Sequence, residues 1–445
     1  MIEKKKWVIT IFAMFLISGI LSSCSRQKSD QNLISDIKIE QSINEIVVSG
    51  ELPSVQIAVI NQDQIIWSKA IGKGSDTHYV YMNGSIQKVV DATAVLQLVE
   101  KGLIDLDADI SDYLPFEINH PQYPDVPITT RMLLSHRSGL DAISDQFDWD
   151  TECHFVEYRP NCNLETQNIS LEEYLMASFT TSGSNFNPNM WIYEPGEKYH
   201  YSVSAYPLLR FLIEYVSGEP YPEYMQDHLF APLEMLHTGF ILEDFHAHHA
   251  IPHTRIDGEN IELPLWNGNG FMMRTTAEDM GKFMLAHINQ GFYNQYQLLR
   301  PETIELMQTK TTKGKSIFNP KSELQDAGYG LGLIHYQNGW VGHGGSTVGY
   351  QSLWQFNPQQ GYGYVIFTNV NGILGGQDDV MSVWDNLAEI RDIIRKELDP
   401  LVTIRTIPWE WIIAWILIAV LINLIPRWLR RKQKEKNLPP NPSCS

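Results

Sequence analysis

The sequence predicts an α/β (α+β) domain in which both ends of the domain form one antiparallel sheet, with helices packed on it and a helical lobe inserted. Short apolar runs typical of strands occur at 54–70 and again after Gly328, whereas 105–300 mixes helical patterns with long loops. Strands on both sides of a helical middle favour a sheet built from the two ends. An apolar run at 409–425 adds one transmembrane helix behind the domain.

The first elements are a hairpin and a helix. Residues 55–60 and 65–70 are apolar and rich in β-branched side chains, and the polar turn at 61–63 between them predicts a β-hairpin. Apolar residues at helical spacing predict a helix over 88–101, which Gly102 would end.

The last third of the domain contains strands and one helix. Glycines separate four runs of strand character, namely 330–336, 339–341, 350–356 and 362–369. A helix is expected over 378–398, because one stripe of it is apolar. The stripe consists of Val380, Val383, Trp384, Leu387, Ile390 and Ile394.

The N-terminus carries an export signal. Three lysines at 4–6 precede an apolar stretch at 7–20, and Leu21-Ser22-Ser23-Cys24 resembles a bacterial lipobox. The pattern predicts a lipoprotein signal peptide over 1–23, lipidation of Cys24 and a polar linker over 24–40. An ordinary signal peptide and an uncleaved anchor are the alternatives, and both would also export the chain.

The C-terminus carries a second membrane signal. Residues 409–425 are almost wholly apolar and long enough to span a hydrocarbon core. Six basic residues follow, and the positive-inside rule then places the tail, 426–445, in the cytoplasm. The domain over 41–400 would therefore lie outside the cell membrane, held there twice. A buried core helix is the poorer alternative, because the basic block has no core to face.

Charge and cysteine content limit the partners. The formal charge is −19, and many basic residues lie in the two end segments, so the middle is strongly acidic and would repel nucleic acid. Cys153 and Cys162 could form a disulfide in an exported loop or remain two buried thiols. No metal or cofactor is predicted, because a surface loop explains the histidine cluster better than a metal site does. That cluster is His246, His248, His249 and His253.

Ser85 and Lys88 are the most informative residues of the chain. Residues three apart at a helix start lie on one face, about one turn from each other. A serine hydroxyl is a poor nucleophile until a base takes its proton, and a lysine in a dry pocket can lose its charge and do so. The helix start also offers free backbone N–H groups to an oxyanion. A serine cap followed by a solvated lysine would give the same pattern. The choice between a catalytic pair and this alternative therefore depends on the segments downstream.

Those segments resemble the serine β-lactamase and penicillin-binding-protein superfamily, in its class C-like branch, from about residue 52 to 398. The resemblance is carried by the Ser-x-x-Lys pair, by the stretches ITTRMLLSHRSGL (128–140) and EPGEKYHYSVSAYPLLRFLIEYVSGEPY (194–221), and by GHGGSTVGY (342–350). Recurrence of these segments by chance in this order is very improbable.

The resemblance implies roles for particular residues. Ser85 would be the nucleophile and Lys88 would accept its proton, while Tyr201 would pass a proton to the leaving group and later activate water. Tyr199 is a nearby competitor for that role. His343 would line the site on a strand with Gly344 and Gly345, where substrate backbone can approach closely. The backbone N–H groups of Ser85 and Ser346 would form the oxyanion hole.

One position departs from the family pattern. Val203 stands where relatives have asparagine in the Tyr-x-Asn motif, and valine cannot bond an acylamino group. We therefore expect a membrane-anchored serine hydrolase that acts through an acyl-serine on an envelope peptide, amide or ester, of carboxypeptidase, esterase or β-lactamase type. The alternative is a catalytically silent sensor or scaffold domain. The sequence does not determine the substrate or the oligomeric state.

Overall fold

The computed structural model describes residues 37–73, 75–141, 170–266, 271–313 and 328–405. The chain divides into two compact units, Met1–Ile394 and Arg395–Ser445. Of the second unit only the end of a long helix, up to Arg405, is described. The following paragraphs concern the first unit.

An antiparallel sheet, with strands from both ends of the domain, forms the centre of this unit. Within the described ranges it has eight strands in the order β2-β1-β14-β13-β12-β11-β10-β9. The N-terminal hairpin of β1 (Ser54–Asn61) and β2 (Ile65–Gly72) joins the C-terminal strands because β1 pairs antiparallel with β14 (Tyr362–Thr368). The next neighbours are β13 (Tyr350–Asn357) and β12 (Val341–Thr347). Both β13 and β14 are buried along their whole length, as expected for a sheet covered on both faces.

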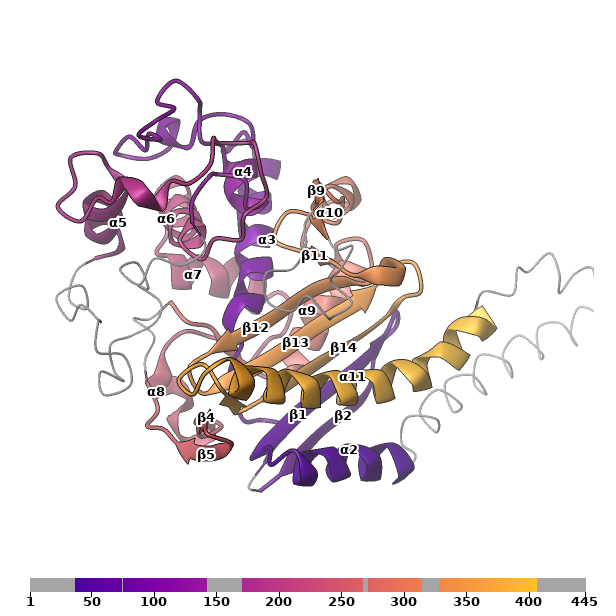
Figure 1. The fold of residues 1–445 in the computed structure, drawn as a ribbon. Coiled ribbons are helices and arrows are strands. Elements are labelled where there is room, and N and C mark those ends of the chain that lie inside the picture. The colour runs from indigo at the N-terminus through magenta and orange to yellow at the C-terminus, as the bar shows by residue number, and fades with distance from the viewer. Residues whose placement is uncertain (1–36, 74, 142–169, 267–270, 314–327, 406–445) are drawn as a thin grey trace, which may run out of the picture. The chain divides into compact units, whose positions relative to one another are not determined.

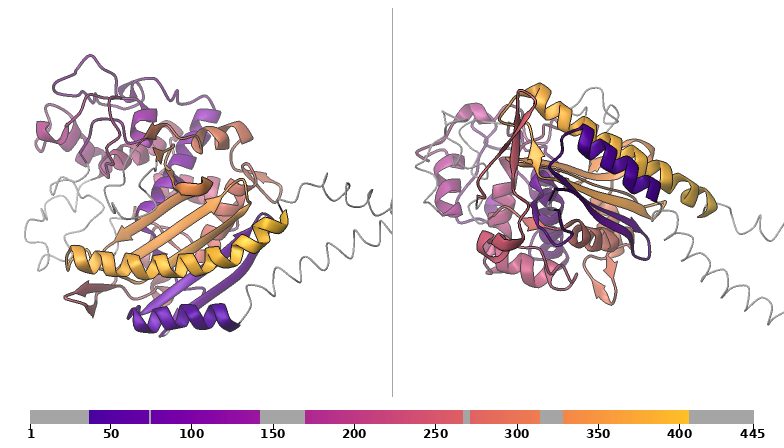
Figure 2. Two further views of the ribbon diagram at one scale, coloured as in Figure 1. Left: turned by 45° about the vertical axis from the view of Figure 1, so that its right-hand side comes forward. Right: turned by 90° about the horizontal axis from the view of Figure 1, so that it is seen from below.

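Helices cover both faces of the sheet. Helix α2 (Ile37–Ser49) and the first part of α11 (Gln377–Arg405) lie across one face, while α9 (Ala277–Ile288) lies behind the other (Figures 1 and 2). Helix α9 packs on β1, β13 and β14, where the Trp354 indole donates to the Met280 carbonyl. The core therefore lies between the central strands and these two helical layers.

A helical lobe is inserted between the two parts of the sheet. It contains α4 (Thr130–Leu134), α5 (Leu171–Phe179), α6 (Ala205–Ser217) and α7 (Tyr221–Met225). A capping box formed by Ser170 and Glu173 starts α5, and Gly218 in the left-handed conformation ends α6. The other strands of two or more residues are β3 (Tyr81–Met82), β4 (His253–Ile256), β5 (Glu259–Glu262), β6 (Arg274–Thr275), β7 (Phe292–Tyr293), β8 (Tyr296–Gln297), β9 (Thr312–Lys313), β10 (Gly328–Tyr329), β11 (Ile334–His335) and β15 (Val370–Asn371). Two further helices are α8 (Leu242–Phe245) and α10 (Pro301–Met307).

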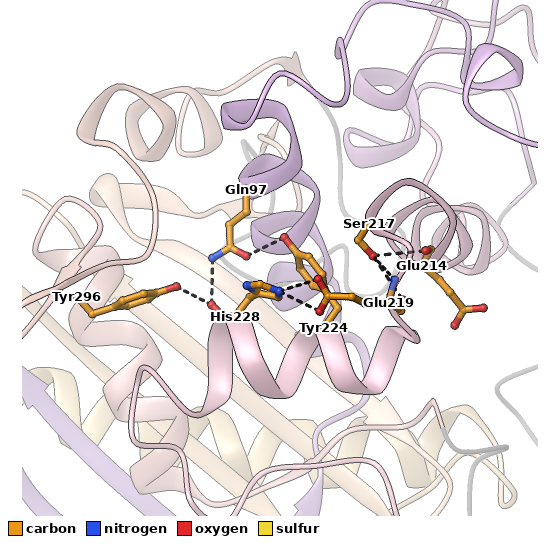
Figure 3. Close-up of polar contacts among 7 residues, drawn as sticks. All are labelled: Gln97, Glu214, Ser217, Glu219, Tyr224, His228 and Tyr296. Carbon is orange, nitrogen blue, oxygen red and sulfur yellow. Dashed lines mark hydrogen bonds and ion pairs between the residues drawn. The ribbon is translucent and has the colours of Figure 1, made fainter.

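Helix α3 (Gln87–Glu100) links the lobe to the sheet. Every residue from Gln87 to Leu98 is buried, so its polar side chains must find partners inside the protein. At its far end Gln97 donates to the His228 and Leu298 carbonyls and accepts from the Tyr224 hydroxyl, as Figure 3 shows for His228 and Tyr224. Neighbouring bonds join Tyr296, Glu219, Ser217 and Glu214 to the same network (Figure 3). This end of α3 is therefore fixed against its surroundings.

The structure confirms the main prediction, an antiparallel sheet formed by both ends of the domain with helices on it. The N-terminal hairpin, the helix over 88–101 and the strands over 350–356 and 362–369 are present with shifts of one or two residues. The predicted helix over 378–398 is the body of α11. Residues 409–425 lie outside the described part of the chain, within which no helix is long and apolar enough to cross a membrane.

Three local predictions were wrong. The range 330–336, predicted as one strand, contains a turn over 330–333 followed by the short β11, because Gly332 has a φ of +77° and the Gly330 N–H donates to the Leu333 carbonyl. The strand predicted over 339–341 begins only at Val341 and continues to Thr347. Apart from these predictions, the structure shows that α2 begins at Ile37, within the range 24–40.

The third error concerns the histidine cluster. The sequence predicts a solvated loop, and His246 and His248 are indeed exposed, but His249 is only 5% exposed and His253 opens β4. The Nδ1 of the buried His249 lies 3.0 Å from the Ala250 carbonyl and 3.2 Å from the Tyr350 hydroxyl.

Candidate active site

Ser85 and Lys88 form the hydrogen-bonded pair that their spacing predicts. Ser85 lies in a 3₁₀ turn (Gly84–Ile86) that leads directly into α3, and the Lys88 Nζ donates to its Oγ at 3.1 Å. Lys88 is 6% exposed, whereas Ser85 remains partly exposed. The hydroxyl is therefore accessible to a reactant while the amine is held in a dry setting, which is the arrangement an activated serine needs.

Tyr201 lies beside Lys88 at the entrance to α6. The Lys88 Nζ stands 5.5 Å from the centre of the Tyr201 ring and 5.1 Å from that of Tyr206, both within the range of a cation–π interaction. The competing Tyr199 packs on Tyr329 at 5.7 Å, and burial raises the pKa of its phenol. These contacts associate Tyr201 with the Ser85–Lys88 pair.

His343 lies on β12, on the other side of Tyr201. The two ring centres are 6.1 Å apart, and the Tyr329 hydroxyl lies 3.1 Å from the His343 Nε2. The Nδ1 of His343 donates to the Gly344 carbonyl, so the Tyr329 hydroxyl is the donor to Nε2 when the imidazole is neutral. Burial, with a smaller effect from the Lys88 charge, lowers the pKa of His343 to about 3. The imidazole is therefore uncharged at neutral pH.

Backbone from β12 packs directly on the turn that holds Ser85. A Cβ placed on Gly84, whose φ is +54°, would lie 2.6 Å from the Ser346 backbone N. A Cβ on Gly345 would collide with the Asn83 carbonyl, which accepts a hydrogen bond from Ser352. The amides of Ser85 and Ser346, predicted to form the oxyanion hole, therefore belong to two segments in backbone contact.

A buried polar network supports α3 one turn beyond Lys88. The Asp91 carboxylate accepts from Arg210 at 3.1 Å and from the Tyr221 hydroxyl at 2.5 Å. Gln87 donates to Tyr221 and to the Phe271 carbonyl and accepts from the Met273 amide. Burial raises the pKa of Asp91, and Arg210 opposes that rise. The network ties the start of α3 to α6, α7 and the segment after residue 270.

The structure thus connects Ser85, Lys88, Tyr201 and His343 through consecutive contacts. Val203 follows Tyr201 and is partly exposed. Cys24, Cys153 and Cys162 lie outside the described residues. Within the described ranges, no group of three or more His, Cys, Asp or Glu side chains could hold a metal ion.

Sequence reasoning missed one residue at the centre of this cluster, His136. Its ring lies 4.3 Å from that of Tyr201 and 4.7 Å from that of Tyr329. It lies in the quoted stretch 128–140, but only the folded chain shows that this stretch contacts the segment before α6.

The comparisons with known proteins assign the family. The Beta-lactamase family model matches residues 39–384, most of the described domain, and the chain belongs to this family. It is 26% identical over 347 residues to PbpX, a candidate penicillin-binding protein of Bacillus subtilis (strain 168), covering 75% of this chain and 73% of PbpX. It is 24% identical to Protein flp of Staphylococcus aureus (strain MW2), covering 76% of this chain and 64% of that protein. The chain thus spans just under two thirds of Protein flp.

Solved structures share the fold. The octameric penicillin-binding protein homologue from Pyrococcus abyssi superposes with a TM-score of 0.62 at 24% identity, covering 79% of this chain and 77% of that one. A D-amino acid amidase from Ochrobactrum anthropi SV3 superposes with a TM-score of 0.59 at 19% identity, covering 80% and 99%. At these identities the likeness establishes the fold alone. With the family assignment, the protein is a β-lactamase-family serine hydrolase.

The contact between Gly84 and Ser346 yields a first prediction. Gly84→Ala should push β12 away from the turn of Ser85 and lower the rate of fluorophosphonate labelling of Ser85 by about a hundredfold, as small displacements in an active site do. Gly102→Ala is the matched control, because Gly102 also has a positive φ, +71°, but a Cβ there meets nothing within 4 Å. Labelling followed by intact mass measures both variants. Wild-type labelling of Gly84→Ala would show that the backbone contact does not shape the site.

Proposed function

We propose that this protein hydrolyses small esters or amides through an acyl-enzyme on Ser85, with Lys88 and Tyr201 moving the protons. The observation that carries the proposal is the 3.1 Å hydrogen bond between Lys88 Nζ and Ser85 Oγ, in a place where Lys88 is buried and Tyr201 lies beside it. A sensor domain without catalysis would not need a buried lysine on its serine.

The proposed reaction has two halves. Neutral Lys88 takes the Ser85 proton as Oγ attacks the carbonyl carbon, and the Ser85 and Ser346 amides stabilise the oxyanion. The carbonyl re-forms, the bond to the leaving group breaks, and Tyr201 delivers the proton to the leaving group, taking it in turn from Lys88. Water then attacks the acyl-serine, and its proton passes to Tyr201 as Tyr201 hands its own phenol proton to Lys88. The tetrahedral intermediate collapses, and Ser85 takes that proton from Lys88 as the acid product leaves.

Two features favour small, uncharged substrates. Val203 offers no amide to an acylamino group, in the position where relatives carry asparagine. The His343 imidazole is neutral, with both ring nitrogens engaged by protein groups, so it presents no positive charge to a carboxylate. We therefore propose that esters and simple amides are better substrates than penicillins or D-alanyl-D-alanine peptides.

We also propose a membrane location outside the cytoplasm, with an envelope substrate. The support is in the sequence: the lipobox at Cys24, the apolar run at 409–425 and the basic tail that follows.

The catalytic assignment predicts that loss of either Ser85 or Lys88 alone abolishes hydrolysis. Ser85→Ala and Lys88→Ala should each reduce hydrolysis of an activated ester, such as a p-nitrophenyl ester, by at least about a thousandfold. Lys101→Ala is the control, because Lys101 is an exposed lysine at the far end of the same helix. Near-wild-type turnover in Ser85→Ala or Lys88→Ala would contradict the assignment of these two residues as the catalytic pair. A wild-type protein that neither turns over esters nor accepts a fluorophosphonate would support the sensor alternative.

The substrate preference predicts an order of kcat/KM. The kcat/KM for small esters should exceed that for penicillins and D-alanyl-D-alanine peptides. Val203→Asn should reduce the ratio of these kcat/KM values by about tenfold to a hundredfold, the effect of one buried hydrogen bond. Val203→Thr keeps the side-chain shape without the amide and should not reduce that ratio. Efficient penicillin hydrolysis by the unmodified protein would contradict the proposal.

The location predicts a fractionation pattern. Cys24→Ser should leave the protein in the membrane fraction, because a spanning helix anchors far more firmly than one acyl chain. Deletion of 409–445 should leave it held by lipid alone. Protease added to intact spheroplasts should digest the domain and spare a C-terminal tag. A cleaved tag with an intact domain would mean the opposite topology and exclude an envelope substrate.

A further inference from the structure

Two loops of the lobe are bonded together directly beside Tyr201. One is the segment 136–141 after α4, and the other is the segment 190–202 before α6. The Ile192 amide donates to the Gly139 carbonyl at 2.9 Å, and the Gly196 amide donates to the Arg137 carbonyl at 2.7 Å. The Asp141 carboxylate lies 3.0 Å from the His200 Nε2. These bonds place residue 136 opposite residues 200–202.

His136 makes the last two bonds of this series, one on each side of Tyr201. Its carbonyl accepts the His200 amide at 2.8 Å, and its Nδ1 accepts the Ser202 amide at 3.1 Å. The tyrosine is thus held through the amides of its two neighbours. Because Nδ1 accepts a hydrogen bond, the neutral ring carries its proton on Nε2.

The backbone of His136 is in an unusual conformation that makes both bonds possible. Its φ is +55°, in the left-handed region, which residues with a Cβ seldom adopt. The side chain is 1% exposed, and its ring packs at 5.4 Å on Tyr206 besides Tyr201 and Tyr329. Burial, together with the nearby Lys88 charge, holds the pKa of His136 well below its usual value, so it is not a cation at neutral pH.

We propose that His136 is the positioning residue for Tyr201, acting through the hydrogen bond that its Nδ1 accepts from the Ser202 amide. The inference rests on the proposed acyl-enzyme reaction, in which Tyr201 both protonates the leaving group and activates water. His136 itself does not touch the reacting atoms. Loss of the acceptor frees residues 200–202 to shift, and deacylation suffers most, because there Tyr201 must orient a small, weakly held water.

The test compares two substitutions at residue 136. His136→Asn retains an acceptor close to the Nδ1 position, and asparagine tolerates a positive φ better than most residues. His136→Leu retains bulk but accepts no hydrogen bond. His120→Leu is the matched control, since His120 is also 1% exposed, lies in the lobe, and accepts the Gln122 amide on its Nδ1 at 3.1 Å.

The measurements are the pre-steady-state burst and the steady-state rate with a p-nitrophenyl ester, together with the melting temperature. His136→Leu should keep a full burst, one acyl group per enzyme, while kcat falls by about a hundredfold and KM falls with it, because the acyl-enzyme accumulates. His136→Asn should recover most of kcat. His120→Leu should lower the melting temperature and leave kcat unchanged.

Three results would overturn the proposal. The first is a wild-type kcat in His136→Leu, the second is a loss of thermal stability alone in that variant, as in His120→Leu, and the third is a His136→Asn variant as slow as His136→Leu. A wild-type protein with no burst and no labelling of Ser85 would instead refute the proposed function, so the two failures are distinguishable.

Discussion

The close backbone contact between β12 and the turn of Ser85 is the constraint on which the site depends. Gly84 and Gly345 allow that contact, since a Cβ on either would meet the backbone of the opposing segment. The turn comes from the first quarter of the chain and β12 from the last. They meet because β1 pairs with β14, which places the N-terminal hairpin and the C-terminal strands in one sheet. The order of the sheet therefore determines where the nucleophile meets the strand that carries His343.

The fold was predictable where local pattern and tertiary position agree. The hairpin of β1 and β2, helix α3 and the buried strands β13 and β14 have apolar runs that only one kind of element satisfies. Prediction failed at 330–336, because glycine at 332 turns the chain inside a stretch whose composition is typical of a strand. It failed again at the histidine cluster, because polar residues such as His249 become buried only through partners distant in sequence.

The site residues likewise fall into those that local sequence predicts and those that depend on tertiary contacts. The spacing of Ser85 and Lys88 is a local property, so their contact follows from helix geometry alone. Tyr201 and His343 were recognised only by resemblance, since nothing in their immediate sequence requires them to meet. His136 carries no periodic signal and lies in a loop, and its position depends on bonds between two loops of the lobe. The partners of Asp91, namely Arg210 and Tyr221, likewise come from other helices.

The surroundings of Tyr201 restrict which groups can exchange protons. Burial lowers the pKa values of His136 and His343, and a hydrogen bond accepted by one ring nitrogen suits the neutral form of each. Burial also raises the pKa values of the Tyr206 and Tyr329 phenols, which therefore remain protonated. These four rings contact Tyr201 or lie over Lys88 without titrating near neutral pH. A proton that leaves Ser85 thus has Lys88 as its direct hydrogen-bond partner and Tyr201 as the next group in line, and the proposed reaction uses that sequence of groups in both halves.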